Sequence, residues 1–148
     1  MPQSASRRRS PGLTQADYTS LADFRYLLRH FLAFSEVAAQ KAGLTPQQHQ
    51  ALLAVKGFPG RERATIGELA ERLNLRHHSV VGLIDRLVSK GLLRRHVDTA
   101  DRRRVKIELT AKSQGLLASL TLAHRDELRR LAPLLHALLA QVEAGAEG

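Results

Sequence analysis

The chain has 148 residues, 43% of them hydrophobic and only 4% aromatic, so we expect one compact domain whose core is built from Leu, Ala and Val in packed helices. Its formal net charge of +9 and pI near 11 favour an anionic partner, either nucleic acid or a membrane surface. The absence of cysteine excludes disulfides, thiolate metal sites and cysteine-based redox sensing, and no apolar run approaches the roughly 18 residues that span a bilayer.

The positive charge is concentrated in one part of the chain. Residues 76–106 contain nine Lys or Arg and three Asp or Glu, whereas residues 107–148 contain four and five. This local excess predicts a binding surface for a polyanion and is not a general property of the chain.

The N-terminal segment is rich in Ser, Pro, Gly and Arg and has almost nothing to bury. We expect a disordered basic arm over residues 1–19, which is interpreted as an inert tail in preference to a DNA-contacting arm. It lacks the apolar stretch of a secretory or twin-arginine signal, so we expect a cytoplasmic, nucleoid-associated protein.

Two helices are expected next. Leucine and phenylalanine recur at intervals of three and four over residues 20–42, with Ser20 placed as the N-cap. Thr45 and Gln48 form the capping pattern that opens a second helix, which ends near residue 56. A turn-rich loop follows.

A short helix, a tight turn and a longer helix come after that loop. Thr65 opens a capping box for a helix to about residue 73, and residues 74–77 make the turn. Apolar residues at helical spacing predict a helix that ends at Lys90, because Gly91 fits the position just after a helix.

The remaining elements are a hairpin and C-terminal helices. Residues 105–109 alternate at period two and predict a strand, with residues 92–97 as its partner and a charged loop over 98–104 between them. Helix resumes after Thr110, and Pro133 predicts a break or kink, followed by a last helix.

This order is typical of a winged helix-turn-helix, so the expected fold is mainly α with a small β-hairpin wing. A helix fits the major groove of DNA, and arginines at the tip of a hairpin can reach the electronegative minor groove. We expect residues 45–109 to form the DNA-binding domain, with helices over residues 20–44 and 110–148 on either side of it in the chain.

Five segments carry a resemblance to a known family. In sequence and order they resemble the MarR (multiple antibiotic resistance regulator) family of winged helix-turn-helix regulators, and the resemblance extends over about residues 20–142. The segments are Leu44–Gln48, Glu68–Leu73, Leu83–Leu92, Asp101–Arg104 and Leu109–Thr110.

The resemblance implies a two-fold dimer in which residues 20–44 and 110–148 are dimerisation helices that intertwine with those of the second chain. It also implies that Arg103 enters the minor groove and that Asp101 holds the shape of the wing. This sequence departs from the family pattern at Arg76, where a Ser or Thr cap is usual, and at Ser113, where glycine is usual. The expected DNA-binding residues are Arg76, His77, His78, Ser79, Val81, Gly82, Arg86, Arg94, Arg102, Arg103 and Arg104.

Other interpretations of these residues are less favoured. His77 and His78 could ligate a metal, but adjacent side chains on a helix point about 100° apart, so we expect no metal or cofactor. Asp85 and Arg86 could be a catalytic pair, but bracing of the wing and a phosphate contact is the favoured interpretation. Because the sequence has no nucleotide-binding glycine loop, nucleophile elbow or paired-metal histidine motif, we expect no enzyme activity.

The expected function is a DNA-binding transcription regulator, a repressor that binds a near-palindromic double-stranded operator as a homodimer, and the resemblance implies that a small molecule, such as an aromatic acid, relieves its DNA binding. The expected ligand residues are Tyr26, His30, Phe34 and His49, with ordinary core packing as the alternative for each. A constitutive or architectural DNA-binding protein is the alternative function. A membrane-surface protein is disfavoured by the capped, globular helices.

Overall fold

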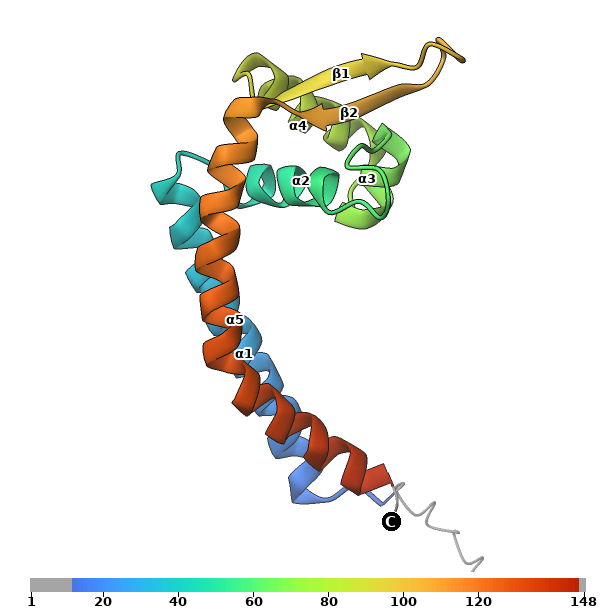
Figure 1. The fold of residues 1–148 in the computed structure, drawn as a ribbon. Helices are drawn as coiled ribbons and strands as arrows, with labels where there is room; N and C mark the ends of the chain where they lie inside the picture. The colour runs from blue at the N-terminus through green and yellow to red at the C-terminus, as the bar shows by residue number, and fades with distance from the viewer. Residues whose placement is uncertain (1–11, 147–148) are drawn as a thin grey trace, which may run out of the picture. The chain divides into compact units, whose positions relative to one another are not determined.

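The computed structural model describes residues 12–146 and contains, within that range, five helices and a two-stranded antiparallel hairpin (Figure 1). The chain forms two compact units: the terminal unit has the described residues up to 32 and from 127 onward, and the central unit has residues 33–126. The predicted basic arm lies largely outside the described residues. No helix in the described range combines the length and hydropathy of a membrane span.

Helix α1, Gln15–Lys41, begins earlier than the sequence predicted. Thr14 and Asp17 cap it reciprocally: the Thr14 N–H donates to Asp17 Oδ2 over 2.6 Å, and the Asp17 N–H donates to Thr14 Oγ1 over 3.4 Å. The predicted boundary of the arm at residue 19 and the predicted N-cap at Ser20 are therefore wrong. Ser20 lies inside the helix, is 5% exposed and contacts Gln141 Oε1 over 3.5 Å.

Helix α5, Ala111–Ala146, continues through Pro133, so the prediction of a separate last helix is wrong. Proline removes one backbone hydrogen bond from a helix. The flanking Leu131 and Leu138 are only 8% and 7% exposed in the terminal unit, where the α5 segment runs antiparallel to the α1 segment (Figure 1). Burial of such side chains contributes about 1.5–3 kcal/mol each, which offsets the lost hydrogen bond.

The N-terminus of α5 explains the serine that departs from the family pattern. The Ser113 N–H donates to Thr110 Oγ1 over 3.3 Å, and the Thr110 N–H donates to Ser113 Oγ over 3.1 Å. Ser113 is completely buried. The side chain therefore completes a capping box that glycine at this position could not make.

Three short helices build the rest of the central unit: α2, Pro46–Lys56; α3, Ile66–Leu73; and α4, His77–Ser89. The capping boxes predicted at Thr45 and Thr65 are both present, which confirms the predicted starts of α2 and α3. Helix α2 packs against α3, α4 and the hairpin. The side chains that are completely buried include Leu52, Val55, Leu69, Val80, Ile84, Leu87 and Ile107.

The hairpin pairs β1, Leu93–Val97, with β2, Val105–Leu109, in antiparallel register. Ala64 adds a third short segment, because its N–H and carbonyl both bond to Ile107, over 3.1 and 2.7 Å. The predicted strand and its predicted partner are thus confirmed. The hairpin is fastened directly to the residue that precedes the N-cap of α3.

Candidate nucleic-acid interface

The start of α4 is set by a tight turn. Asn74 ends α3 in the left-handed conformation, with φ 52° and ψ 46°, a region that Asn tolerates better than most residues. Arg76 is then the N-cap of α4 and makes no side-chain capping bond. The first turn of α4 therefore keeps backbone N–H groups that no capping side chain occupies.

Helix α4 has one buried and one outward side. Val80, Leu83, Ile84 and Leu87 form the buried stripe that the sequence predicted. The outward side offers no side-chain hydrogen-bonding group at Val81 and Gly82, which are half-buried and apolar. Its exposed polar residues are Arg76, His77, His78, Ser79, Asp85, Arg86 and Ser89.

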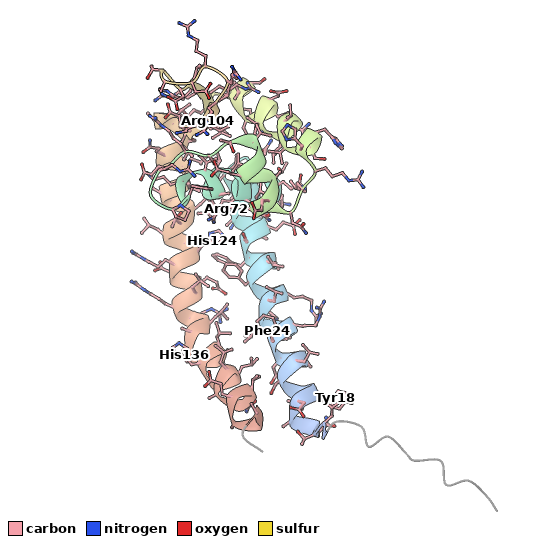
Figure 2. All side chains as sticks on the ribbon, turned by 90° about the vertical axis from the view of Figure 1, so that its right-hand side faces the viewer. Tyr18, Phe24, Arg72, Arg104, His124 and His136 are labelled. Atoms are coloured by element: carbon pink, nitrogen blue, oxygen red, sulfur yellow. The ribbon has the colours of Figure 1, made fainter. Side chains whose placement is uncertain are left out.

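The tip of the hairpin is a compact turn held by two aspartates. The Arg103 N–H donates to Asp101 Oδ1 over 3.1 Å, and the Ala100 N–H donates to Asp98 Oδ1 over 3.0 Å. The bond from Ala100 lowers the pKa of the Asp98 carboxyl below its ordinary value. Arg102, Arg103 and Arg104 are all exposed on this turn, and Arg104 is labelled in Figure 2.

One face of the hairpin is tied to α4. Asp85 on α4 forms an ion pair with Arg95 on β1. The pairing gives Asp85 the bracing geometry that the sequence favoured for it over catalysis. Arg86, the next residue, is exposed and lies on the outward side of α4.

The other face of the hairpin is tied to the loop before α3. Glu108 Oε1 accepts from Arg94 Nε over 2.5 Å, and Oε2 accepts from Arg63 Nε over 2.6 Å. Burial alone would raise the pKa of the Glu108 carboxyl, but the bonds from Arg94 and Arg63 bring it below its ordinary value.

Arg94 therefore differs from the other predicted DNA-binding residues. Neighbouring residues on a strand point to opposite faces, so Arg94 lies on the face away from Arg95 and its α4 partner. Neither Arg63 nor Glu108 is among the site residues predicted from the sequence. The one available signal was a glutamate at an alternating position of a strand whose partner strand carries an arginine.

The four predicted ligand residues form two separate pairs. The rings of Tyr26 and His30 lie 4.4 Å apart in the terminal unit. Phe34 and His49 belong to the central unit, where both contact the His124 ring, at 5.3 and 4.9 Å between centroids. The structure defines no single site from the four.

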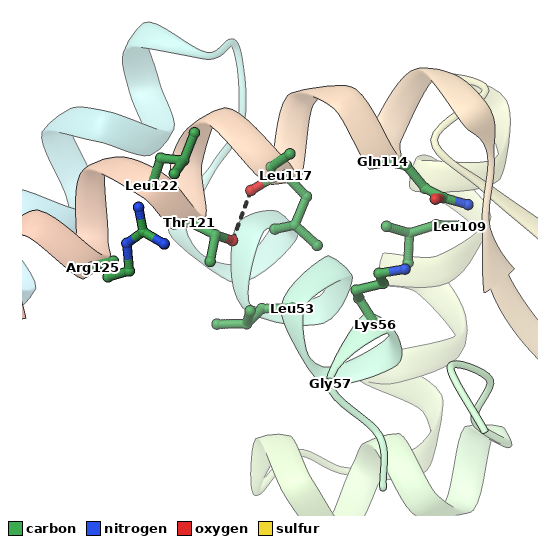
Figure 3. Close-up of a pocket in the computed structure, with 10 residues that line it drawn as sticks. Leu53, Lys56, Gly57, Leu109, Gln114, Leu117, Thr121, Leu122 and Arg125 are labelled. Carbon is green, nitrogen blue, oxygen red and sulfur yellow. Dashed lines mark hydrogen bonds between the residues drawn. The ribbon is translucent and has the colours of Figure 1, made fainter. Parts of the chain in front are cut away.

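The central unit contains an apolar cavity of about 580 Å³ that the sequence did not predict (Figure 3). Lys56 and Arg125 supply positive charges to its wall. The Thr121 hydroxyl donates a hydrogen bond to the Leu117 carbonyl over 2.7 Å. None of the four predicted ligand residues lines it. Its apolar lining comes from Leu53, Leu109, Leu117, Ala118 and Leu122.

No group of three or more metal-ligating side chains occurs among residues 12–146. His77 and His78 are both exposed at the start of α4. Their surroundings in the described structure therefore supply no further ligand for an ion.

Comparison with known proteins places these features in a family context. A family model described as MarR family matches residues 42–104. A relative from Bacillus subtilis, the uncharacterized HTH-type transcriptional regulator YcgE, is 35% identical over 104 residues, a match that covers 70% of this chain and 66% of the relative.

Solved structures share the fold at lower identity. A mutant MepR from S. aureus, bound to an oligodeoxyribonucleotide, is 21% identical with a TM-score of 0.66, covering 87% of this chain and 97% of that chain. Rv1404 from Mycobacterium tuberculosis is 19% identical with a TM-score of 0.70, covering 95% and 98%. AbsC, a MarR family transcriptional regulator from Streptomyces coelicolor, is 20% identical with a TM-score of 0.66, covering 94% and 100%.

Proposed function

This chain belongs to the MarR family of transcription regulators, and we propose that it represses transcription by binding a near-palindromic double-stranded operator as a homodimer. The observation that carries the proposal is the pairing of α4 with an arginine-tipped hairpin in one packed unit. An exposed helix of this size fits the major groove. The guanidinium groups of the tip suit the narrow minor groove beside it.

In this proposal the two parts of the surface have different tasks. The exposed start of α4, with His77, His78 and Ser79, approaches base edges, while Arg103 enters the minor groove. Val81 and Gly82 offer no side-chain hydrogen bonds, so DNA shape contributes much of the specificity. Arg76, Arg86, Arg102 and Arg104 contact phosphates.

The proposed dimer forms through the terminal unit. Its α1 and α5 segments leave large apolar side chains in solvent, such as Leu21 at 62% and Leu134 at 56% exposure. They also enclose an apolar groove of about 340 Å³ that includes Phe24 and His136, both labelled in Figure 2. Exposed apolar surface of this extent supports burial against a second copy, and a two-fold dimer matches a palindromic operator.

The proposed regulator responds to a small aromatic acid held in the cavity of about 580 Å³. Apolar walls suit an aromatic ring, and Lys56 or Arg125 suits its carboxylate. None of the four rings predicted from the sequence lines this cavity. A ligand that prefers a non-binding conformation by about 1.4 kcal/mol lowers DNA affinity tenfold.

The test is footprinting and anisotropy titration of the purified full chain on DNA upstream of its own gene. A symmetric protected site, with affinity at least about 10³-fold above that for random DNA, supports a specific regulator. Equal affinity for all DNA would contradict it and would favour the alternative of a constitutive architectural binder. The lack of side-chain hydrogen-bonding groups at Val81 and Gly82 is the observation behind that alternative.

A further inference from the structure

The strongest unexplained feature of the central unit is a single carboxylate that joins three neighbouring backbone segments. Arg94 and Glu108 are direct cross-strand partners in the register of the hairpin. Arg63 precedes Ala64, which bonds to Ile107 on the other side of β2. The Glu108 side chain, only 10% exposed, thus spans β1, β2 and the loop before α3.

Both oxygens of this carboxylate are occupied by charged donors. Oε1 accepts a hydrogen bond from Arg94 Nε, and Oε2 accepts one from Arg63 Nε. His96 Nδ1 lies 4.0 Å from Oε1. Removing a charged acceptor from such a site leaves two guanidinium groups without their partner. Arg94 and Arg63 are 66% and 41% exposed, so it is the carboxylate, 10% exposed, that distinguishes this cluster from an ion pair such as Lys56–Glu62, whose carboxylate is 67% exposed.

The carboxylate lies where it can control the direction of the wing. Thr65, the N-cap of α3, follows Arg63 by two residues, so the Arg63 contact ties the wing to the first helix of the helix-turn-helix. The Asp85–Arg95 pair ties the opposite face of the wing to α4. The wing is fastened on both faces.

A small tilt of the wing at Glu108 moves its tip by a larger distance. At about 3.3 Å per residue, Arg103 lies up to about 16 Å along the strand from Glu108, and a tilt of about 10° there moves the tip by about 3 Å. A displacement of this size is enough to remove a directional hydrogen bond.

We propose that Glu108 is a positioning residue for DNA binding: by joining Arg94 and Arg63 it holds the wing at the angle that brings Arg103 into the minor groove. The inference rests on the proposed function. It also assigns Arg94 and Arg63 to the scaffold of the wing and not to the set of phosphate contacts.

The experiment is a double-mutant cycle between Glu108→Gln and Arg103→Ala, measured as affinity for the operator and for random DNA. We expect each single substitution to weaken operator binding about tenfold and the double variant to be within about twofold of Arg103→Ala, because residues that act through one contact are not additive. Glu108→Gln should keep its affinity for random DNA, since no cation is lost.

Two controls separate positioning from general damage. Glu62→Gln removes an exposed ion pair of the neighbouring loop and should leave operator binding unchanged. Arg63→Gln keeps the β1–β2 contact and removes only the contact to the loop, and it should reproduce Glu108→Gln in the cycle. If Glu108→Gln does not fold, Arg63→Gln takes its place in the double-mutant cycle.

The outcomes are distinguishable. Additive effects of Glu108→Gln and Arg103→Ala, or an unchanged operator affinity for Glu108→Gln, would overturn the positioning role while the wild-type protein still prefers its operator. A wild-type protein with no preference for any operator would instead overturn the proposed function.

Discussion

The imidazole rings of His49 and His124 lie 4.9 Å apart in the central unit, between α2 and α5. His124 Nδ1 is 2.6 Å from the Leu120 carbonyl, which can only accept, so Nδ1 carries a proton. Its Nε2 is 2.9 Å from Ser35 Oγ on α1. Burial, and then the charge of His124, lower the pKa of His49.

This relationship predicts that acid destabilises the fold. A histidine whose pKa is lower in the folded state binds protons more readily when unfolded, so stability rises with pH between the lowered pKa and about 6.5. We expect the Tm of the wild-type protein to fall as pH decreases from about 7 to about 5. In His49→Gln this decrease should be smaller, whatever the absolute Tm.

Exposed His78, which lies outside the proposed dimer interface, provides the matched control, since His78→Gln should retain the wild-type dependence of Tm on pH. Tracking the imidazole resonances by NMR gives a second measurement. A His49 resonance that titrates at the ordinary value would contradict the role given to this pair.

The Arg103→Ala substitution should weaken operator binding by about 1–3 kcal/mol and reduce the dependence of affinity on salt, because one guanidinium no longer displaces counterions from DNA. The measurement is anisotropy titration at several salt concentrations. Arg94→Ala is the informative comparison: because Arg94 pairs with Glu108, its loss should weaken operator binding as Glu108→Gln does but leave the salt dependence of binding to random DNA nearly unchanged. Equal salt dependence of wild type and Arg103→Ala would rule out the minor-groove contact.

The sequence predicted what local chemistry determines. The capping boxes at Thr45 and Thr65 and the alternation over residues 105–109 each depend on neighbours within a few residues, and all three appear in the structure. The same reasoning placed the start of α1 wrongly, because Ser20 and Thr14 offer similar local capping signals. Tertiary burial decided between them, since Ser20 is 5% exposed.

Contacts between distant residues could not be predicted in this way. The bonds of Glu108 join residues 45 and 14 positions away, and no periodicity in the sequence indicates them. The continuation of α5 through Pro133 is a similar case, because its stability depends on packing of Leu131 and Leu138 in the terminal unit. The apolar cavity likewise arises from α2 and α5, which are far apart in sequence.

The dimer proposal predicts that a charge in the apolar groove of the terminal unit separates the two chains. Leu28 lines this groove and is 40% exposed, so Leu28→Glu should be tolerated in the isolated chain but would bury an unpaired carboxylate in a dimer. Light scattering should show that Leu28→Glu is a monomer, and its operator affinity should fall because the dimer is lost. Val97→Glu, at an apolar wing residue 50% exposed, should remain dimeric. A dimeric Leu28→Glu would place the interface elsewhere.

The cavity between α2 and α5 predicts a ligand response that can be blocked by filling it. Ala118 lines the cavity and is exposed, so Ala118→Phe should occupy part of the space without creating a void in the core. A panel of hydroxybenzoic acids should raise the Tm of the wild-type protein and weaken the operator complex. At a ligand concentration about a hundredfold above Kd, binding should add about 2.7 kcal/mol to the free energy of unfolding. Ala118→Phe should bind the operator normally and lose both responses. Arg125→Gln tests the carboxylate contact separately, because it should lower affinity for the acids while leaving the cavity open. If no acid changes either the Tm or the operator affinity of the wild-type protein, repression is constitutive, and the cavity then has no role in sensing such acids.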